Sequence, residues 1–402
     1  MKWLEFAFRN VWRNRRRSFI TILIAALGTT ALLSAAGFGL WTYEALQEAS
    51  TREFGHIVIS HPDFYQKEEE VSMQLGLNDH EKIQAQMNAD PRVQYTLPHV
   101  QFSGLISNGD KSTIYLGTGV DPNEFSIKGP FLKMIEGSVL HNDAATSEVM
   151  LGKDLAHSMG AKVGTPLTLL ATTSDGVLNA IDVEVVGTFS VGISDFDKRA
   201  VYTNIKTAQD LLVTKKISTL SLFLKNTALA PGMIADLQKR YPNLGIKPWW
   251  ELAFYYEAVK ALYNRLFGVM GFIMVVLVFF GVFNTMSMTV VERTRETGTL
   301  AALGAYPHEL VRNFMLEAFV IGLLGVTIGV ISAAGISILL DHAGIQMPPP
   351  PGRSAGYPLL IRMSFQLYSM MFIVVPLTCM GAAWFAARRG VHKPIVEALA
   401  HV

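Results

Sequence analysis

Two groups of residues have the types and the spacing of catalytic side chains. Residues 187–192 read GTFSVG, which approaches the Gly-x-Ser-x-Gly turn of a nucleophile elbow, but the first glycine is one position too early. We interpret these glycines as strand-end turns. Asp195 and Asp197 could form a carboxylate pair for acid–base chemistry, although a solvated loop is the favoured interpretation. The sequence therefore predicts no enzyme active site within this chain.

Motifs for metal and nucleotide binding are missing from the sequence as well. The ten histidines show no ligand spacing, and the single cysteine, Cys379, excludes an internal disulfide and any multi-cysteine metal site. No Gly-x-x-x-x-Gly-Lys-Ser/Thr occurs, so the chain has no phosphate-cradling P-loop of its own. Any work driven by ATP must therefore come from a partner protein.

The composition predicts a membrane protein. Half of the 402 residues are hydrophobic and 17% are charged, below the roughly 25% of an ordinary soluble domain. Such a chain is too apolar to be disordered. Its 34 Lys and Arg residues are matched by 33 Asp and Glu residues, which leaves no basic excess to neutralise a nucleic acid.

Four stretches run without a charged residue for more than the roughly 20 residues that a membrane helix needs. Around them we predict transmembrane helices at residues 18–43, 263–291, 311–341 and 363–387. A buried helix of a soluble protein would normally be shorter. The first stretch could be a signal peptide, but it is too long for a signal h-region and five arginines precede it, so a retained helix is favoured.

The distribution of Lys and Arg predicts the orientation of these helices. Basic residues concentrate in residues 1–17, 292–310 and 388–402, and the loop at 342–362 has few. By the positive-inside rule, both termini and the middle segment are cytoplasmic, whereas residues 44–262 and the loop are external.

Residues 1–17 also have an amphipathic pattern. Trp3, Phe8 and Trp12 interleave with Arg9 and Arg13, which predicts a helix that lies at the membrane interface. A plain cytoplasmic helix is the alternative.

Residues 44–262 are long enough for a core of their own, and we predict an α+β domain there that could divide into two lobes. Turn signals at Asn108-Gly109 and Ser174-Asp175-Gly176 each separate two strand-like runs and predict hairpins. Helices are predicted at His80–Asn88 and Met233–Tyr241. Trp249–Phe267 contains no helix breaker and predicts an outward continuation of the second span, with a separate short helix as the alternative.

Small residues mark where helices could approach closely. Gly325-x-x-x-Gly329 in the third span has the spacing of a close helix contact, and we predict that it packs against the fourth span.

The segment between the second and third spans, Asn284–Ala318, carries the most informative pattern. Its sequence predicts the end of one span, a polar turn, a short helix and the beginning of the next span. Arg293 and Glu296 alternate with small residues, and Leu300 and Leu303 offer a compact apolar face. Such a helix could insert into a groove of a partner protein, whereas the alternative is a charged loop that only obeys the positive-inside rule.

This segment resembles the signature of the MacB/FtsX-type permeases, the type VII ABC transporter family, and in particular its LolC/LolE-like members. The positions that match are Asn284, Ser287, Glu292, Arg293, Glu296, Gly298, Leu300, Ala302, Leu303, Gly304, Ala305, Phe314, Leu316, Glu317 and Ala318. The segment departs from the family at Thr297, where isoleucine is usual, and at Thr299. Residues 9–18, residues 149–164 and the tail around Pro394 resemble further family segments, so the resemblance extends over most of the chain.

The resemblance implies a membrane α-helical fold of four transmembrane helices with a large external α+β domain of the MacB periplasmic core type. It implies that the permease pairs with a second copy or a paralogue in the bacterial inner membrane. A cytoplasmic dimer of ABC ATPases docks beneath, so ATP and Mg²⁺ belong to that partner and the chain itself binds no cofactor. The residues expected to couple to the ATPase are Glu292, Arg293, Glu296, Gly298, Leu300, Leu303 and Gly304, and those expected on the substrate-cavity or dimer helices are Gly37, Gly39 and Asn284.

Several activities within the family remain open. We favour the extraction or release of a lipoprotein or lipid-like amphiphile from the outer leaflet by mechanotransmission, with membrane lipid and a periplasmic carrier or adaptor as further partners. Tripartite efflux of drugs or peptides is the main alternative, and a non-transporting signalling scaffold is another.

The run Pro348–Pro351 in the external loop predicts a stiff polyproline segment that could dock on a partner, or could merely close the loop.

Overall fold

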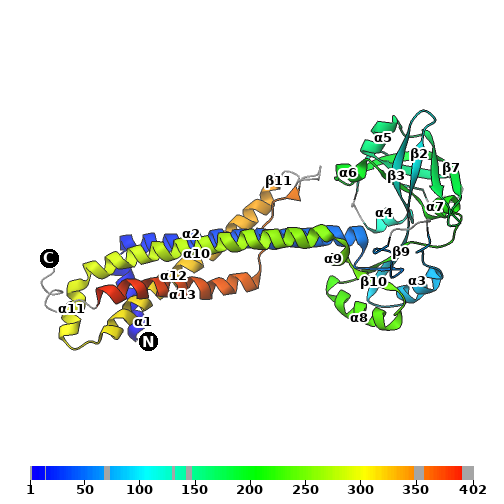
Figure 1. Ribbon diagram of the computed structural model, residues 1–402. Helices are drawn as coiled ribbons and strands as arrows, with labels where there is room; N and C mark the ends of the chain where they lie inside the picture. The colour runs from blue at the N-terminus through cyan, green and yellow to red at the C-terminus, as the bar shows by residue number, and fades with distance from the viewer. Residues whose placement is uncertain are drawn as a thin grey trace. The chain divides into compact units, whose positions relative to one another are not determined.

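The computed structural model describes residues 2–13, 15–67, 73–128, 132–141, 147–347 and 357–391 (Figure 1). The chain divides into two compact units. The helical unit comprises Met1–Glu44, Val259–Met347 and Pro358–Val402, and the α+β unit comprises Ala45–Ala258 and Pro348–Tyr357. The run Pro348–Pro351 and the tail around Pro394 lie outside the described residues.

Among the described residues, four helices are long and apolar enough to cross a bilayer: α2, α10, α12 and α13. Each corresponds to one of the predicted spans, although α13 begins at Phe365, two residues after the predicted start of the fourth span. The helices that contribute to the helical unit are α1 Lys2–Arg13, α2 Arg15–Phe54, α10 Phe254–Glu292, α11 Thr294–Ala302, α12 Pro307–Ala343 and α13 Phe365–Gly390. Both α2 and α10 extend beyond this unit and contribute residues to the α+β unit.

Close helix contacts in the helical unit form at glycines. A methyl group on Gly325 would lie 2.5 Å from Ala25 Cβ of α2, and one on Gly329 would lie 2.6 Å from Thr29 Cβ. The prediction that these two glycines pack against the fourth span is therefore wrong, because both face α2. Gly322, three residues earlier, is the glycine that faces α13, where a methyl group would lie 2.9 Å from Pro376 Cα.

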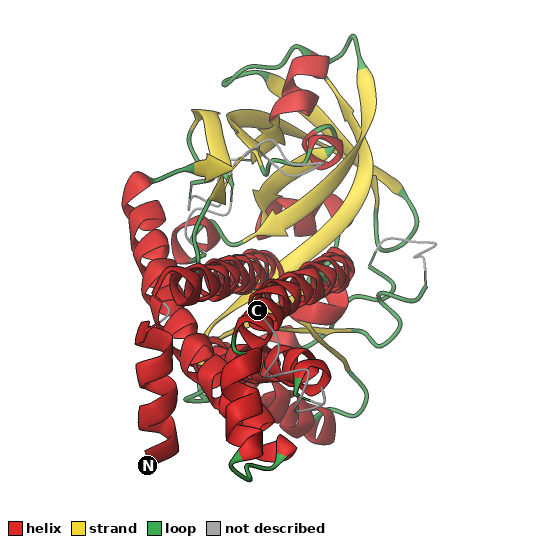
Figure 2. Cartoon of the chain, turned by 90° about the vertical axis from the view of Figure 1, so that its left-hand side faces the viewer, coloured by secondary structure: helices red, strands yellow, loops and turns green. Residues whose placement is uncertain are grey.

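The α+β unit is built on one ten-stranded sheet in the order β10-β1-β9-β2-β3-β8-β5-β7-β4, with β6 paired to β2 and β7. The strands, yellow in Figure 2, curve strongly. Their bounds are β1 Ile57–Ser60, β2 Val93–Ser107, β3 Ser112–Val120, β4 Lys133–Gly137, β5 Glu148–Gly152, β6 Pro166–Thr172, β7 Leu178–Ser190, β8 Ala200–Asn204, β9 Thr219–Leu224 and β10 Gly245–Pro248. This α+β architecture confirms the predicted fold class.

Short helices pack against this sheet. They are α3 His80–Asn88, α4 Glu124–Ile127, α5 Lys153–Met159, α6 Ser194–Asp197, α7 Ile205–Leu212, α8 Ala230–Arg240 and α9 Trp249–Leu252, with a 3-10 turn at Thr227–Leu229. The pair β11 Gln346–Met347 and β12 Tyr357–Pro358 forms a separate two-stranded sheet.

The long strand β2 joins two halves of the sheet instead of separating two lobes. From Val93 to His99 it pairs with β9, and from Val100 to Ser107 it pairs with β3. The main apolar core draws side chains from both halves, including Ile57, Val100 and Leu151.

The local predictions for this unit hold well. The strands β2 and β3 flank Asn108-Gly109 as an antiparallel hairpin, and β6 and β7 flank Ser174-Asp175-Gly176 in the same way. Both predicted helices form, as α3 and α8. Asn-Gly and Gly-containing turns specify hairpins through local backbone geometry, which is why the sequence suffices here.

The predicted unbroken helix from Trp249 to Phe267 is wrong at one residue. Ala253 leaves the helical conformation between α9 and α10, at φ −83° and ψ 64°. This break accompanies an aromatic cluster in which the rings of Trp249 and Tyr256 meet edge to face at 4.7 Å, packed by Leu46 and Phe54. The separate short helix of the alternative therefore forms at Trp249–Leu252, whereas the predicted outward continuation of the second span is confirmed from Phe254 to Phe267.

Asp197 is another correction. Its side chain is fully buried instead of solvated, and it accepts hydrogen bonds from Ser190 Oγ and from the backbone N–H of Val191 at 3.0 Å. Asp195, by contrast, is exposed and pairs with Lys198. The two acids therefore do not form a carboxylate pair, and Asp197 instead holds the turn that ends β7.

An ionic cluster lies inside the α+β unit, made by His99, Glu124 and Lys128, and we call it the buried cluster. His99 Nε2 lies 2.8 Å from Glu124 Oε2, and Lys128 Nζ pairs with the same carboxylate. All three side chains are almost fully buried. Lys128 Nζ also donates to the backbone carbonyl of Glu53, 3.2 Å away in the last turn of α2, which fixes that helix end to α4.

Burial alone would raise the pKa of Glu124, but the charges of His99 and Lys128 and their hydrogen bonds overcome it and lower this pKa to about 2.

Candidate functional site

The short helix α11 lies between two membrane-length helices, and its ends are defined by local sequence. It stops where Gly304 adopts φ +98°, a left-handed conformation that favours glycine. The N–H of Gly304 then bonds to the carbonyl of Ala301 at 3.0 Å. A capping box between Tyr306 and Glu309 starts α12 immediately afterwards. The turn between α11 and α12 is therefore tight, and the predicted short helix between two spans is present as α11.

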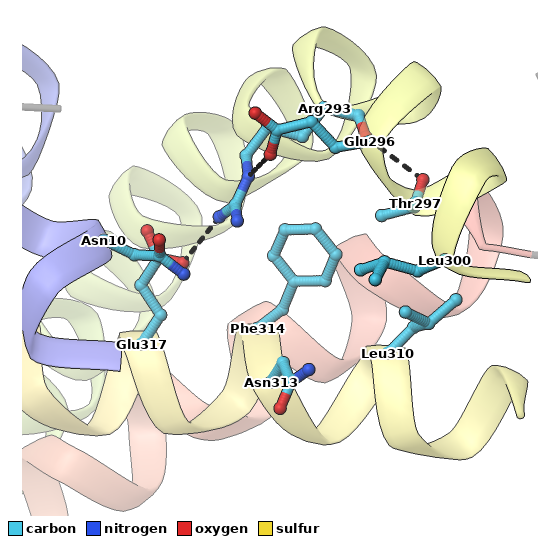
Figure 3. Close-up of a pocket in the computed structure, with 9 residues that line it drawn as sticks. All are labelled: Asn10, Arg293, Glu296, Thr297, Leu300, Leu310, Asn313, Phe314 and Glu317. Carbon is cyan, nitrogen blue, oxygen red and sulfur yellow. Dashed lines mark hydrogen bonds and ion pairs between the residues drawn. The ribbon is translucent and has the colours of Figure 1, made fainter. Parts of the chain in front are cut away.

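Arg293 occupies the centre of the site. Its Nη1 lies 2.9 Å from Glu317 Oε2 of α12, and its Nε lies 2.9 Å from Glu296 Oε2 of α11. The guanidinium also lies over the ring of Phe314, 5.5 Å from its centre (Figure 3). Only 4% of the Glu317 side chain is exposed, so Arg293 is the charge that compensates a buried carboxylate.

Two arginines from the N-terminal helices reach the same region. Arg13 Nη2 of α1 lies 3.1 Å from Glu296 Oε1, and Arg17 of α2 pairs with Glu292. We call Arg13, Glu296, Arg293 and Glu317 the coupling-end network. It connects α1, α11 and α12 through consecutive ion pairs.

Glu296 is held by two cations at once. The hydrogen bond from Arg293, together with the charges of Arg293 and Arg13, lowers its pKa below the ordinary value, although partial burial opposes this. Because about half of the side chain is exposed, each of its pairs is worth only about 0–1 kcal/mol.

A small cavity of about 30 Å³ lies beneath this network. It is large enough for about one or two waters and far too small for an amphiphile. Its lining residues, drawn in Figure 3, are Asn10, Arg293, Glu296, Thr297, Leu300, Leu310, Asn313, Phe314 and Glu317. The cavity is therefore a packing feature between helices and not a substrate pocket.

The tip of the site is apolar and uncovered. Leu303 is 80% exposed and Tyr306 is 66% exposed, and Leu300 is partly exposed beside them. The Tyr306 ring stacks on His308 at 5.5 Å. Large exposed apolar side chains next to an ordered polar network are typical of a surface that another protein covers.

The structure brings together the seven residues predicted to couple to an ATPase. Glu292, Arg293 and Glu296 form ion pairs, and Gly298 is buried against neighbouring segments. Leu300, Leu303 and Gly304 lie toward the exposed tip. Their role in coupling stays a prediction.

Gly37, Gly39 and Asn284 lie elsewhere in the helical unit. A methyl group on Gly37 would lie 2.6 Å from Ile361 Cγ2, and one on Gly39 would lie 2.7 Å from the Phe267 ring. Both glycines therefore contact other segments of the same chain. Asn284 is exposed on α10 among apolar neighbours. A role for these residues at a dimer or substrate cavity also stays a prediction.

Sequence reasoning missed Arg13, Arg17 and Tyr306, and it gave Glu317 no partner. A signal for the arginines was present, because Arg13 and Arg17 are four residues apart and so are Glu292 and Glu296. Charges four residues apart on a helix lie on one face, so two helices with matched spacing of opposite charge could pair. In the structure each set is divided between two consecutive helices, α1 and α2 for the arginines and α10 and α11 for the glutamates.

The fold and this site together define the class of protein: a membrane permease with a large α+β unit inserted between its first two membrane-length helices. Residues 18–240 match the MacB-like periplasmic core domain, and residues 268–395 match the FtsX-like permease C-terminal family. The chain belongs to the MacB/FtsX-type family of ABC transporter permeases.

Individual relatives agree with this assignment. LolC of the lipoprotein-releasing system of Xylella fastidiosa is 25% identical over 356 residues, which cover 84% of this chain and 82% of LolC. The macrolide export ATP-binding/permease protein MacB of Shewanella oneidensis is 23% identical over 374 residues, which cover 85% of this chain and 53% of MacB. Among solved structures, the periplasmic region of MacB from Actinobacillus actinomycetemcomitans matches 52% of this chain and 95% of its own, at 14% identity and a TM-score of 0.38.

Proposed function

We propose that this permease couples ATP hydrolysis by a partner ABC ATPase to the extraction of a lipoprotein or lipid-like amphiphile from the outer leaflet of the inner membrane. The observation that carries the coupling step is the coupling-end network. Arg293 joins α11 to α12, and Arg13 joins α11 to α1. A displacement of α11 would therefore pull on α1 and α12 through these ion pairs.

The proposed route to the outside runs through α2 and α10. These are the two helices that contribute residues to both units, so motion at the coupling end reaches the α+β unit through continuous helix. Within the α+β unit, Lys128 fixes the last turn of α2 to α4. Such transmission requires no substrate path through the membrane.

The proposed substrate class follows from the relatives. The alignment with LolC, a protein named for lipoprotein release, extends over most of both chains. Export of a macrolide-like compound is the second candidate, and the match to MacB supports it. A reconstituted permease–ATPase complex separates the two: lipoprotein release with ATP supports the first, and ATP-dependent transport of a macrolide supports the second.

The proposed orientation places both termini and α11 in the cytoplasm. It rests on the arginines that flank the helices at these ends. A cysteine at the exposed position Asp175 should then react with an impermeant thiol reagent in intact cells, whereas a cysteine at the exposed position Thr299 should not. Equal labelling of the two would contradict the proposed orientation.

The decisive experiment for coupling is Leu303→Asp. A charge at the uncovered tip should reduce co-purification of the ATPase and abolish its stimulation, because the apolar contact becomes a desolvated carboxylate. Leu178→Asp is the matched control, because Leu178 is also a largely exposed leucine and lies in the α+β unit. Full retention of the ATPase by Leu303→Asp would show that α11 is not the docking helix.

A further inference from the structure

An open hollow of about 500 Å³ lies at the junction of α1 and α2, on residues that the coupling argument does not explain. It is lined by Phe8, Arg9, Trp12, Arg13 and Arg15. The rings of Phe8 and Trp12 stack at 6.3 Å, and both are about half exposed or more. The guanidinium of Arg15 lies over the Trp12 ring, 5.6 Å from its centre. Aromatic and cationic side chains therefore share one surface.

The cations of this hollow differ in what they bind. Arg13 pairs with Glu296. Among the described residues, no carboxylate pairs with Arg15, and its guanidinium instead lies over the Trp12 ring. A guanidinium with unused donors is suited to bind two oxygens of a phosphate group.

An uncovered apolar stripe continues from Arg15 along α2. Phe19, Leu23 and Leu27 follow it at intervals of four residues, so all lie on one face of the helix. These side chains are 64%, 44% and 61% exposed, respectively. The guanidinium could bind the phosphate of a phospholipid, and the apolar stripe that follows it could contact the hydrocarbon chains. The surface therefore matches a phospholipid in shape and charge.

The positive charge of this face favours one of the occupants that could cover it. A second copy related by a two-fold axis would bring its own arginines against these, which like-charge repulsion disfavours. A lipid with an anionic headgroup complements the arginines, and a tryptophan beside it suits the headgroup level of a bilayer.

We propose that this surface binds one anionic phospholipid, with its phosphate on Arg15 and its acyl chains along Phe19, Leu23 and Leu27. The proposal rests on α2 spanning the membrane and not on the identity of the transported substrate. Since Arg13 both lines the hollow and holds Glu296, the lipid would lie next to the coupling-end network.

The test counts lipids on the purified full-length permease by native mass spectrometry, after delipidation and addition of phosphatidylglycerol or phosphatidylcholine. We expect the wild type to retain one phosphatidylglycerol in preference to phosphatidylcholine. Arg15→Gln should weaken this preference about tenfold, the size expected for one charge-assisted hydrogen bond. Arg15→Lys keeps the charge but loses the two-oxygen geometry, so its loss should be smaller.

Arg16→Gln is the matched control, because Arg16 is exposed and adjacent but does not line the hollow. Equal losses in Arg15→Gln and Arg16→Gln would overturn the proposal in favour of unspecific surface charge. Displacement of the lipid by millimolar inorganic phosphate alone would overturn it in favour of a small-anion site. A change in oligomeric state with unchanged lipid binding would assign the face to a second copy. None of these readouts requires the ATPase, so failure here is distinct from failure of the coupling proposal.

Discussion

Two ionic networks among the described residues, the buried cluster and the coupling-end network, have opposite surroundings. In the buried cluster, His99, Glu124 and Lys128 are all almost completely buried. In the coupling-end network, the exposed fraction of the side chain falls from 58% at Arg13 and 52% at Glu296 to 14% at Arg293 and 4% at Glu317. The buried cluster cannot change partners without leaving a bare charge in the interior.

The coupling-end network has a different arrangement. Arg293 contacts two carboxylates at once, and Glu296 contacts two arginines. A contact that breaks at the exposed side leaves groups that water can solvate, at a cost near that of a surface ion pair. We therefore propose that the buried cluster holds an element in place, whereas the coupling-end network shifts while staying connected.

Removal of Glu124 should have the largest effect on stability. Glu124→Ala leaves Lys128 and His99 without their common anion, and we expect a loss of about 3–5 kcal/mol. Thermal unfolding of the full chain measures this effect, with the exposed Asp195→Ala as the control. The double variant Glu124→Leu/Lys128→Met should recover most of the loss, and no recovery would mean that packing and not charge holds the site.

Acid should weaken the same cluster. The pKa of Glu124 is lowered from 4.5 to about 2, so its contribution to folding is complete above about pH 4.5 and is lost as the pH falls toward 2. The shift corresponds to about 3 kcal/mol. Glu124→Gln should flatten the stability profile in this window, and an unchanged slope would assign the acid sensitivity to other carboxylates.

Arg293→Ala should have a smaller effect on folding and a large effect on coupling. Glu317 would keep its burial and lose its hydrogen-bonded cation, and we expect a loss of about 2–3 kcal/mol because Arg293 is partly exposed. The assay compares ATPase stimulation with thermal stability. If Arg293→Ala/Glu317→Gln restores stability while stimulation stays low, the pair acts in transmission, and recovery of both together would make it structural only.

Arg13→Ala should have the smallest effect. Its pair with Glu296 is exposed, so the expected loss of stability is about 0–1 kcal/mol and should vanish at high salt. Measurement of ATPase stimulation at low and high ionic strength checks this. A loss as large as that of Arg293→Ala would mean that the exposed pair of Arg13 and Glu296 is not weaker than the buried pair of Arg293 and Glu317.

The sequence was sufficient where structure depends on near neighbours. Asn108-Gly109 predicts its hairpin through turn geometry, and uncharged length predicts the membrane-length helices. It was insufficient where the partner is distant along the chain. Nothing local shows that Gly325 faces α2, because this outcome depends on which helices the fold brings together.

The same distinction between near and distant partners applies to the candidate site. The family signature located α11 and its exposed leucine, Leu303, since these lie within one segment. The pairing of Arg293 with Glu317 joins residues 24 positions apart, and that of Arg13 with Glu296 joins residues 283 positions apart. In the sequence, the only indication of the contact between Arg13 and Glu296 is the matched four-residue spacing of the two arginines and the two glutamates.

The long strand β2 also constrains how this protein can evolve. It passes from one half of the sheet to the other between His99 and Val100 without an intervening residue. Because side chains alternate along a strand, a single insertion there would turn every later side chain of β2 to the opposite face. Insertions and deletions should therefore accumulate at the tips of hairpins such as Asn108-Gly109, while the length of β2 stays constant among functional variants.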